Sequence, residues 1–423
     1  MSRENLTLAI LGALCVVAVV GATPSDPPVA AVRAGAAASS TSPSNTQADC
    51  PAEELVPAAA EMTVVPVIAE EKRGSLVLGT WRDLPGWGID NPAPAWNAFL
   101  KSCGPLRTQR EWQQVCNLAA AVPASPANSL ITKFFEQNFA PHQVINADGS
   151  DNGLVTGYYE PLLRGSRAPS ERYRYPLYSA PEDLITVDLS EVYPEFKNKR
   201  MRGRLIGNKV VPYHSRGDIE RDSTVLKGRE LIWVDDLVDV FFLHIQGSGQ
   251  VRLQTGELVR IGYADQNGHP FRSVARVLME RGELKLGQTS MQGIKAWARR
   301  HPDRVHVYLN ENPSYVFFKE LPRDLTGPIG TLGVPLTAER SIAIDPRVIP
   351  LGVPVYLSTT YPSSQQPLNR IVLAQDTGGA INGGVRADFF WGFGDAAGEQ
   401  AGVMKQRGKM WVLLPKEYQV SAN

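Results

Sequence analysis

The segment from residue 371 to residue 410 constrains the fold most, because it alternates apolar runs with turn residues and carries two aspartates between them. The run Ile371–Ala374 has the composition of a buried strand, and it leads into Asp376 and the pair Gly378–Gly379. Glycine adopts positive φ without steric strain, so this pair predicts a tight turn after the strand. Asp388 directly precedes the aromatic run Phe389–Trp391. The pattern predicts buried strands with a carboxylate beside each.

Burial gives such carboxylates a specific chemistry. Rings that exclude water raise the pKa of a neighbouring carboxyl group toward the working pH, as a general acid requires. Asp376 and Asp388 are therefore candidates for acid–base catalysis, and Phe389–Trp391 are the rings that would keep Asp388 dry. A purely structural interpretation stays open, because Asp before Gly is common at turns, where its oxygens accept backbone N–H groups.

A third aspartate completes a known pattern. Asp345 in AIDPRVIPLGVPVYL, Asp376 in AQDTGGAINGG and Asp388 in RADFFWG resemble the three-aspartate double-psi β-barrel domain of the membrane-bound lytic murein transglycosylase A family. Further segments resemble that family in the same order, so that the resemblance runs from about residue 81 to residue 415: GYYEPLLRG (157–165), FFLHIQGSGQ (241–250), GYADQNGHPFRSVARVLMERG (262–282) and ENPSYVFF (311–318).

The resemblance implies a mainly β chain with helices, of class α+β. It implies a C-terminal double-psi β-barrel domain, a second β-barrel inserted into it, and a substrate groove between the two. We expect the following division of the chain: a helical first part of domain 1 at 73–154, the inserted β-barrel at 155–262, a helical segment of domain 1 at 263–327, and the three-aspartate barrel at 328–416.

Local patterns predict several elements within this plan. Apolar residues at helical spacing predict helices around Trp96 and over Glu111–Ala121, Ser129–Phe139, Phe271–Arg281 and Met291–Arg300. Short apolar runs broken by Gly and Pro indicate strands and an all-β module between residues 155 and 260, with these examples: Gly153–Tyr159, Lys209–Pro212, Leu231–Val234 and Val240–Leu243.

The composition is that of an ordinary globular protein, and its charges are too evenly balanced to create a strong net electrostatic field. Lys+Arg and Asp+Glu both number 43 among 423 residues. A balanced chain is not drawn to nucleic acid, and a mostly uncharged partner such as a glycan suits it. We expect no nucleic-acid partner.

The N-terminal residues predict export. Arg3 precedes an apolar run over Leu6–Ala22 whose last residues are small, which is typical of a signal peptide, although a short anchor stays open. A lipid on Cys15 is doubtful because Leu14 is too large for the position before a modified cysteine. We expect location in the periplasm or cell envelope, with outer-membrane association open. Residues 23–72 are rich in Ala and Pro and predict a disordered tether, with a removed propeptide as the alternative.

After such an export signal, three cysteines remain, Cys50, Cys103 and Cys116. Cys103 and Cys116 form a bridge or stay free thiols, and the sequence leaves that choice open. No histidine stands at ligand spacing to these cysteines, so we expect no metal site, and we expect no cofactor.

The resemblance places substrate-binding residues in its motifs. Tyr158 and Tyr159 offer faces for stacking a sugar ring, and we expect only one of them to do so because a Tyr pair in a strand usually turns one ring into the core. Amide and hydroxyl groups suited to sugar hydroxyls complete the expected set, together with a carboxylate and the turn glycines: Gln246, Ser248, Asn267, Glu160, Gly378 and Gly379. Gln246, Ser248 and Asn267 could instead be turn residues that hold the neighbouring glycines in place. Glu160 could instead accept a hydrogen bond from a backbone N–H group. His244 and His269 receive no chemical role.

The activity implied by the resemblance is cleavage of the β-1,4 bond between N-acetylmuramic acid and N-acetylglucosamine in peptidoglycan without water. The muramoyl 6-hydroxyl attacks its own anomeric carbon, so that one acid/base suffices and a 1,6-anhydro product forms. By the resemblance, Asp388 is this acid/base and Asp376 supports it, while Asp345 supports the site or only orders the barrel. Expected partners are peptidoglycan glycan strands and other cell-wall enzymes, and we expect a monomer.

Two other classes of protein stay in view. Asp376-Thr377-Gly378 resembles an aspartic-protease motif, but no second copy of such a motif occurs in the chain. A non-catalytic peptidoglycan-binding protein, with aspartates that only bind sugar hydroxyls, is the other alternative. The sequence does not distinguish action at chain ends from action within chains.

Overall fold

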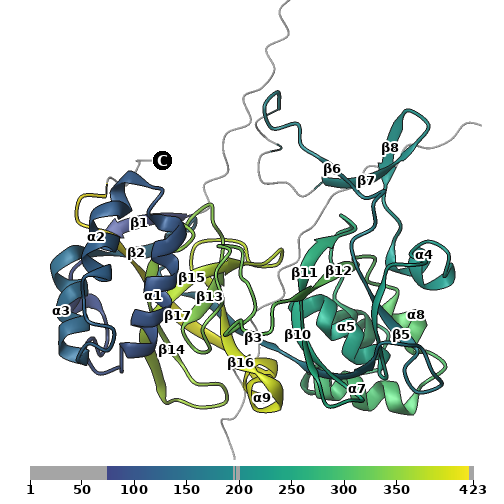
Figure 1. Ribbon diagram of the computed structural model, residues 1–423. Helices are drawn as coiled ribbons and strands as arrows, with labels where there is room; N and C mark the ends of the chain where they lie inside the picture. The colour runs from purple at the N-terminus through teal and green to yellow at the C-terminus, as the bar shows by residue number, and fades with distance from the viewer. Residues whose placement is uncertain (1–73, 194–195, 197–200, 419–423) are drawn as a thin grey trace, which may run out of the picture. The chain divides into compact units, whose positions relative to one another are not determined.

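The computed structural model describes residues 74–193, 196 and 201–418. The predicted signal or anchor (1–22), the tether (23–72), Cys15 and Cys50 lie outside these residues. Figure 1 shows the described elements. The helices are α1 (Ala93–Leu106), α2 (Arg110–Ala120), α3 (Asn128–Asn138), α4 (Arg216–Arg221), α5 (Leu237–Gln246), α6 (Val274–Glu280), α7 (Met291–Arg300), α8 (Val305–Leu309) and α9 (Gly394–Val403), with 3-10 turns η1 (Trp81–Asp83) and η3 (Leu286–Gln288). The strands are β1 (Gly74–Leu78), β2 (Phe139–Asn146), β3 (Gly153–Glu160), β4 (Leu162–Ser166), β5 (Tyr175–Tyr178), β6 (Ile185–Val187), β7 (Met201–Ile206), β8 (Lys209–Pro212), β9 (Glu230–Val234), β10 (Ser248–Leu253), β11 (Leu258–Gln266), β12 (Val316–Leu321), β13 (Ser341–Ile344), β14 (Pro354–Thr360), β15 (Pro367–Thr377), β16 (Arg386–Phe393) and β17 (Lys405–Pro415).

Six strands close into a barrel. Their order is β17-β14-β15-β13-β16-β3, and β3 pairs again with β17 to complete the ring. Two of the pairings, β13 with β15 and β16 with β3, are parallel, while the others are antiparallel. Strands β2 and β1 extend the sheet beyond β17. A closed ring leaves no free edge among its strands, and it confirms the expected barrel at the C-terminal end of the chain.

Three helices pack beside this barrel and share its core, in which aromatic rings meet: Trp96, Phe99, Phe134, Phe135 and Phe139. The helices predicted near Trp96, 111–121 and 129–139 are confirmed as α1, α2 and α3. Cys103 of α1 and Cys116 of α2 form a disulfide, with their Cα atoms 5.4 Å apart. Of the two alternatives that the sequence left open for these cysteines, the structure shows the disulfide.

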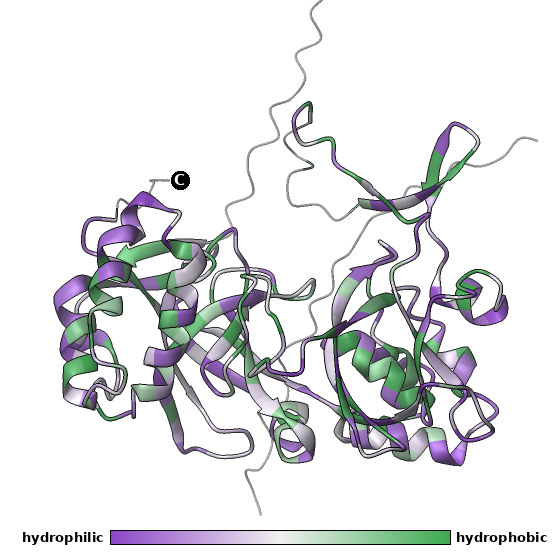
Figure 2. Cartoon of the chain, viewed as in Figure 1, coloured by the Kyte–Doolittle hydropathy of each residue, from purple (hydrophilic) through white to green (hydrophobic). Residues whose placement is uncertain are grey.

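A second sheet has the strand order β12-β11-β10-β4-β9-β5, and an isolated parallel bridge between Ser179 and Phe318 joins its two edges. Helix α5 packs Val240 and Leu243 into the core of this sheet. The opposite face of α5 packs Val238 and Phe241 against α6, α7 and α8. Figure 2 shows α5 as a mostly hydrophobic helix, as burial on both faces requires.

The strand predicted at Val240–Leu243 is therefore wrong, and so is the purely β character of the module, which contains α4 and α5. A short apolar run fits a buried strand and a buried helix equally well. The flanking residues favour the helix. Asp236 accepts backbone N–H bonds from Val238 and Asp239 at the N-terminus, and Gly247 ends the helix with φ of 77°.

Strand pairing also differs from the expected division of the chain at two places. Strand β3 belongs to the closed barrel, and β12, expected within a helical segment of domain 1, pairs with β11. Helices α6–α8 pack on α5, and Met291 at the start of α7 also contacts the barrel core. A small third sheet has the order β6-β7-β8. Within the described ranges, none of the helices is both long enough and apolar enough to cross a membrane.

Candidate functional site

Strand register brings two of the three aspartates together. Ala343 of β13 pairs with Asp376 of β15 on one side and with Asp388 of β16 on the other. Adjacent strands lie about 4.8 Å apart, so the two aspartate backbones are roughly 10 Å apart across β13. Neither pairing is local in the sequence, because Asp376 and Asp388 both come well after Ala343, beyond the intervening strand β14.

Asp388 is half-buried and has one hydrogen-bond donor among the described residues. Thr156 lies opposite Asp388 in the parallel β16–β3 pair, and its hydroxyl donates to Asp388 Oδ1 at 2.7 Å. Burial raises the pKa of Asp388, and the neighbouring charge of Asp376 adds to this rise, while Thr156 and Arg386 act in the opposite direction. A carboxyl group with a raised pKa holds a proton that it can donate.

Asp376 has many more donors. Its Oδ1 accepts bonds from the Thr331 backbone N–H at 3.0 Å, the Thr331 hydroxyl at 3.0 Å and the Thr377 backbone N–H at 2.9 Å. Its Oδ2 accepts the Tyr158 hydroxyl at 3.1 Å. Burial raises the pKa of Asp376, whereas these four donors lower it because they favour the charged form. Burial outweighs these donors, so the pKa of Asp376 is raised overall, as that of Asp388 is. Asp376 has four donors and Asp388 has one, so hydrogen bonding favours the charged form more strongly at Asp376.

Asp345 orders a loop instead. It is 1% exposed and pairs with Arg347, whose Nε lies 2.6 Å from Oδ1, and it also accepts the Gly383 backbone N–H at 2.8 Å. Burial opposes the charge, but the bonds from Arg347 and Gly383 outweigh it and lower the pKa of Asp345. A buried, paired carboxylate of this kind fits the loop-ordering alternative for Asp345.

The loop between β15 and β16 corrects one expectation about glycine. Among its residues, Gly383 has positive φ, at 105°, while Gly378 and Gly379 do not. Gly378 is constrained by space instead, because a Cβ there would lie 2.9 Å from Ile381. The left-handed turn residue thus lies at Gly383, beside the Asp345 contact.

Only one of the three rings after Asp388 shares its face of β16. Side chains alternate along a strand, so Phe390 lies on the side of Asp388, and its ring centre is 5.2 Å from that of Tyr158. Phe389 and Trp391 contact each other at 5.0 Å and belong to the barrel core. The expectation that all three rings keep Asp388 dry is therefore wrong for Phe389 and Trp391.

Tyr158 and Tyr159 differ in burial, as expected for neighbouring residues of a strand. Tyr158 is half-buried with its hydroxyl on Asp376, and burial beside the two aspartates raises its pKa well above the usual value, so it remains a donor. Tyr159 is buried, and its hydroxyl donates to Met291 Sδ at 3.1 Å. The inclusion of Tyr159 among the sugar-binding residues is thus corrected.

Two further expected binding residues are buried and hydrogen-bonded within the protein, although Glu160 Oε1 has no partner among the described residues. Glu160 is 1% exposed and pairs with Arg260 at 2.5 Å. Asn267 is 1% exposed and binds the backbone oxygens of His214 and Pro313 through Nδ2, while its Oδ1 accepts the Tyr315 N–H. Neither side chain is available to a ligand, and Asn267 has the turn-holding role that the sequence left open.

Gln246 and Ser248 lie at the junction between α5 and β10, and both are half-buried. Gln246 Oε1 accepts the Tyr159 backbone N–H at 3.1 Å and so ties α5 to β3. His244 is buried and hydrogen-bonded to Arg216 at 2.9 Å. Among the described residues, no three His, Cys, Asp or Glu side chains are grouped to hold a metal ion.

Sequence reasoning missed Thr156 and Thr331, the donors to Asp388 and Asp376. Thr156 directly precedes the motif that starts at Gly157, and this adjacency was the available signal in the sequence. Thr331 lies between β12 and β13 and carries no comparable signal, because only the folded loop brings it to Asp376.

Known proteins resemble this chain over most of the described residues. Two family models match it, the MltA specific insert domain over residues 154–319 and the 3D domain over residues 340–414. Membrane-bound lytic murein transglycosylase A of Escherichia coli (strain K12) is 32% identical over 278 residues, which cover 64% of this chain and 68% of the relative.

Solved structures resemble it as well. The monoclinic crystal structure of MltA from Neisseria gonorrhoeae is 40% identical, with a TM-score of 0.73 over 82% of this chain and 96% of that chain. The crystal structure of E. coli MltA with bound chitohexaose is 27% identical, with a TM-score of 0.58 over 82% of this chain and 95% of that chain.

Proposed function

The chain belongs to the membrane-bound lytic murein transglycosylase A family, and we infer from this membership that it cleaves peptidoglycan as a lytic transglycosylase. The bond cleaved is the β-1,4 link between N-acetylmuramic acid and N-acetylglucosamine, and the product carries a 1,6-anhydro ring. The observation that carries the mechanism is the pair of aspartates on either side of Ala343, one with a single donor and one with four.

Asp388 is the acid and then the base. In its protonated form it gives its proton to the glycosidic oxygen, which leaves with the N-acetylglucosamine side as the bond to the anomeric carbon breaks. The muramoyl 6-hydroxyl then bonds to that carbon and returns its proton to Asp388. No water enters, and Asp388 ends in the state in which it began. The raised pKa of Asp388 supports this assignment, because the first step needs a protonated carboxyl group.

Asp376 supports the reaction through its charge. Four donors favour its anionic form, which stabilises positive charge that develops on the sugar ring and also helps to keep Asp388 protonated. Thr156 fixes the orientation of Asp388 through Oδ1. Tyr158 presents its half-buried ring beside Asp376. The candidate substrate contacts that we retain are Tyr158, Gln246, Ser248 and Gly378–Gly379. The chitohexaose bound to the E. coli relative supports a glycan as the ligand.

Replacement of Asp388 by Asn tests the assignment. Asn cannot donate a carboxyl proton, so Asp388→Asn is expected to lower the rate of 1,6-anhydro muropeptide formation by about 10²-fold or more. The exposed Asp303, which lies between α7 and α8, gives a matched control, and Asp303→Asn is expected to leave the rate unchanged. Anhydro product from Asp388→Asn at the wild-type rate would remove Asp388 from the mechanism.

We further propose that the chain is exported and acts in the periplasm at the cell envelope. The apolar N-terminal run after Arg3 supports export, and the membrane-bound relatives support a location at the envelope. Fractionation of cells that produce the full chain, followed by mass spectrometry of its N-terminus, tests this: cleavage near residue 22 indicates a signal peptide, an intact N-terminus in the membrane fraction indicates an anchor, and a cytoplasmic full-length chain contradicts export.

A further inference from the structure

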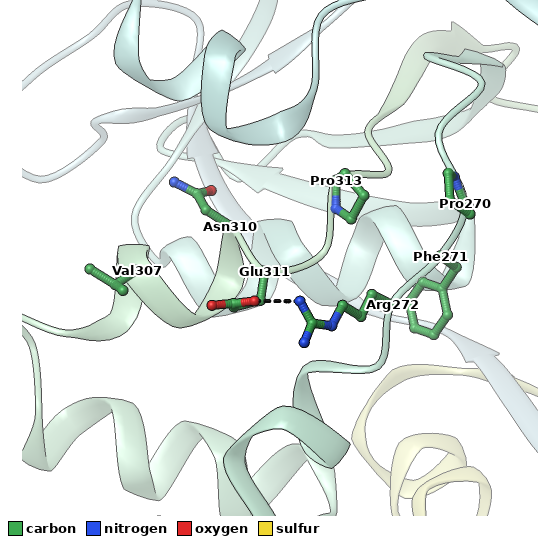
Figure 3. Close-up of a pocket in the computed structure, with 7 residues that line it drawn as sticks. All are labelled: Pro270, Phe271, Arg272, Val307, Asn310, Glu311 and Pro313. Carbon is green, nitrogen blue, oxygen red and sulfur yellow. Dashed lines mark hydrogen bonds and ion pairs between the residues drawn. The ribbon is translucent and has the colours of Figure 1, made fainter. Parts of the chain in front are cut away.

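A pocket of about 460 Å³ lies away from the aspartates, among residues that the catalytic proposal does not use. Figure 3 shows it between two segments. Pro270, Phe271 and Arg272 come from the connection between β11 and α6, and Val307 and Asn310 come from α8 and its C-terminal end. A pocket of this size can accommodate a few amino-acid residues or one sugar.

One wall of the pocket adjoins an ion-pair cluster that has one more cation than anion. Glu311 receives two guanidinium groups: Arg272 Nη1 lies 2.6 Å from its Oε2, and Arg281 binds its Oε1. Arg272 and Glu311 line the pocket, while Arg281 binds Glu311 from outside the lining, so the extra positive charge lies beside the pocket. The Arg272 side chain is 55% exposed, so its remaining N–H groups can reach an added carboxylate.

Apolar surface surrounds this charge. Phe271 is 52% exposed and Val307 is 60% exposed, and the exposed Pro270 adds a further apolar wall. Large hydrophobic side chains beside an exposed guanidinium group suit a ligand that presents methyl groups and a carboxylate together. A bare glycan presents hydroxyls and few carboxylates, and it would match this lining less well.

We propose that this pocket binds the carboxylate-bearing stem peptides of peptidoglycan, and not the sugar chain. The proposal rests on the peptidoglycan-cleaving function inferred above. A stem peptide carries alanine methyls, which pack on Phe271 and Val307, and acidic groups, which pair with Arg272. The pocket makes the enzyme favour glycan strands that still carry their peptides.

Comparison of two substrates tests the proposal. The full chain and its variants Arg272→Ala and Phe271→Ser are assayed on intact sacculi and on glycan strands freed of peptides by an amidase. Loss of a charge-assisted hydrogen bond is expected to raise KM about tenfold for the peptide-bearing substrate, with kcat and the rate on peptide-free strands unchanged. Arg276→Ala is the matched control, because Arg276 is an exposed arginine paired with Glu280 on α6. It is expected to change neither rate.

Equal rates for wild type and variants on both substrates would overturn the proposal, and so would equal losses on both, which would indicate damage to the fold. Absence of anhydro product from wild type on either substrate would instead contradict the function itself. A binding titration with the free stem tripeptide gives an independent readout: wild type and Arg276→Ala are expected to bind it about tenfold more tightly than Arg272→Ala. The same affinity for all three proteins would contradict the proposal.

Discussion

Asp376 and Asp388 differ in their surroundings, and the main difference is the number of hydrogen-bond donors that each carboxyl group receives. Thr156 gives one hydroxyl to Asp388, while Thr331, Thr377 and Tyr158 give four donors to Asp376. Hydrogen bonds to a carboxylate favour its charged form. We therefore expect the protonation states to respond separately to changes at the threonines.

Removal of the Thr156 hydroxyl makes this measurable. The bond from Thr156 lowers the pKa of Asp388, so its loss in Thr156→Val raises that pKa further. The alkaline limb of the pH–rate profile, where Asp388 loses its proton, is expected to move up by roughly 0.5–1 pH unit. Thr156→Ser keeps the hydroxyl and is expected to retain the wild-type limb. An alkaline limb that stays in place in Thr156→Val would contradict the role of this bond.

Stability gives a second test at the same residue. The folded pKa of Asp388 is raised above its unfolded value, so its charge destabilises the fold at pH values above the folded pKa. Asp388→Asn is therefore expected to have a higher Tm than wild type at pH 7, and the difference is expected to disappear as pH falls toward the unfolded pKa of Asp near 4. Thermal unfolding followed by circular dichroism measures it. A lower Tm for Asp388→Asn at pH 7 would contradict a buried, unfavourable charge.

Helix α1 links the site to the barrel wall. Its residue Lys101 donates to Thr326 Oγ1 at 3.2 Å and to Thr337 Oγ1 at 3.1 Å, on either side of the loop that carries Thr331. Gln375, next to Asp376, donates to Ala98 O of the same helix at 3.0 Å. The position of α1, which its disulfide to α2 supports, thus bears on the geometry at Asp376.

Loss of the disulfide is expected to weaken this element. It closes a loop with a sequence separation of 13 residues, for which chain entropy gives about 3 kcal/mol of stability. The double variant Cys103→Ser/Cys116→Ser is expected to unfold at lower urea concentration, with a free energy of unfolding smaller by about that amount. Reduced wild type is the control and is expected to match the variant. Equal midpoints for the oxidised wild type and the variant would show that the bridge adds no stability.

Some elements follow from the sequence and others do not. The amphipathic spacing around Trp96 and in 111–121 predicted α1 and α2, because that pattern is local. The helix α5 was missed because an apolar run carries no period when both faces are buried. Asp376 and Asp388 were predicted as acid–base candidates from the strand, turn and aromatic pattern, and the family resemblance supplied their separate roles. Their common neighbour Ala343 and the donor Thr331 depend on non-local pairing, which no local pattern contains.

At the scale of the whole molecule, a single residue, Pro161, connects the closed barrel to the second sheet, since β3 ends at Glu160 and β4 begins at Leu162. The chain returns to the barrel between β12 and β13. Glu160 binds Arg260 of β11 at 2.5 Å and Gln250 of β10 at 3.0 Å. A nearly buried ion pair therefore fixes this junction. Breaking one partner of such a pair leaves an uncompensated charge.

Glu160→Ala is expected to lower the free energy of unfolding by about 3–5 kcal/mol for this reason. The exposed pair of Arg276 with Glu280 provides a comparison, and Glu280→Ala is expected to cost less than about 1 kcal/mol. Urea unfolding of the full chain measures both. Equal costs for the two variants would show that the junction does not depend on Glu160.

The central claim is that a sugar hydroxyl, and not water, attacks the anomeric carbon. Mass spectrometry of the muropeptides released from purified sacculi in water enriched in oxygen-18 tests it most directly. The account predicts products lighter by one water than the hydrolysed form and without the heavy oxygen, and it predicts that Asp388→Asn forms them far more slowly. Products with a reducing end that carries oxygen-18 would show a hydrolase and contradict the account.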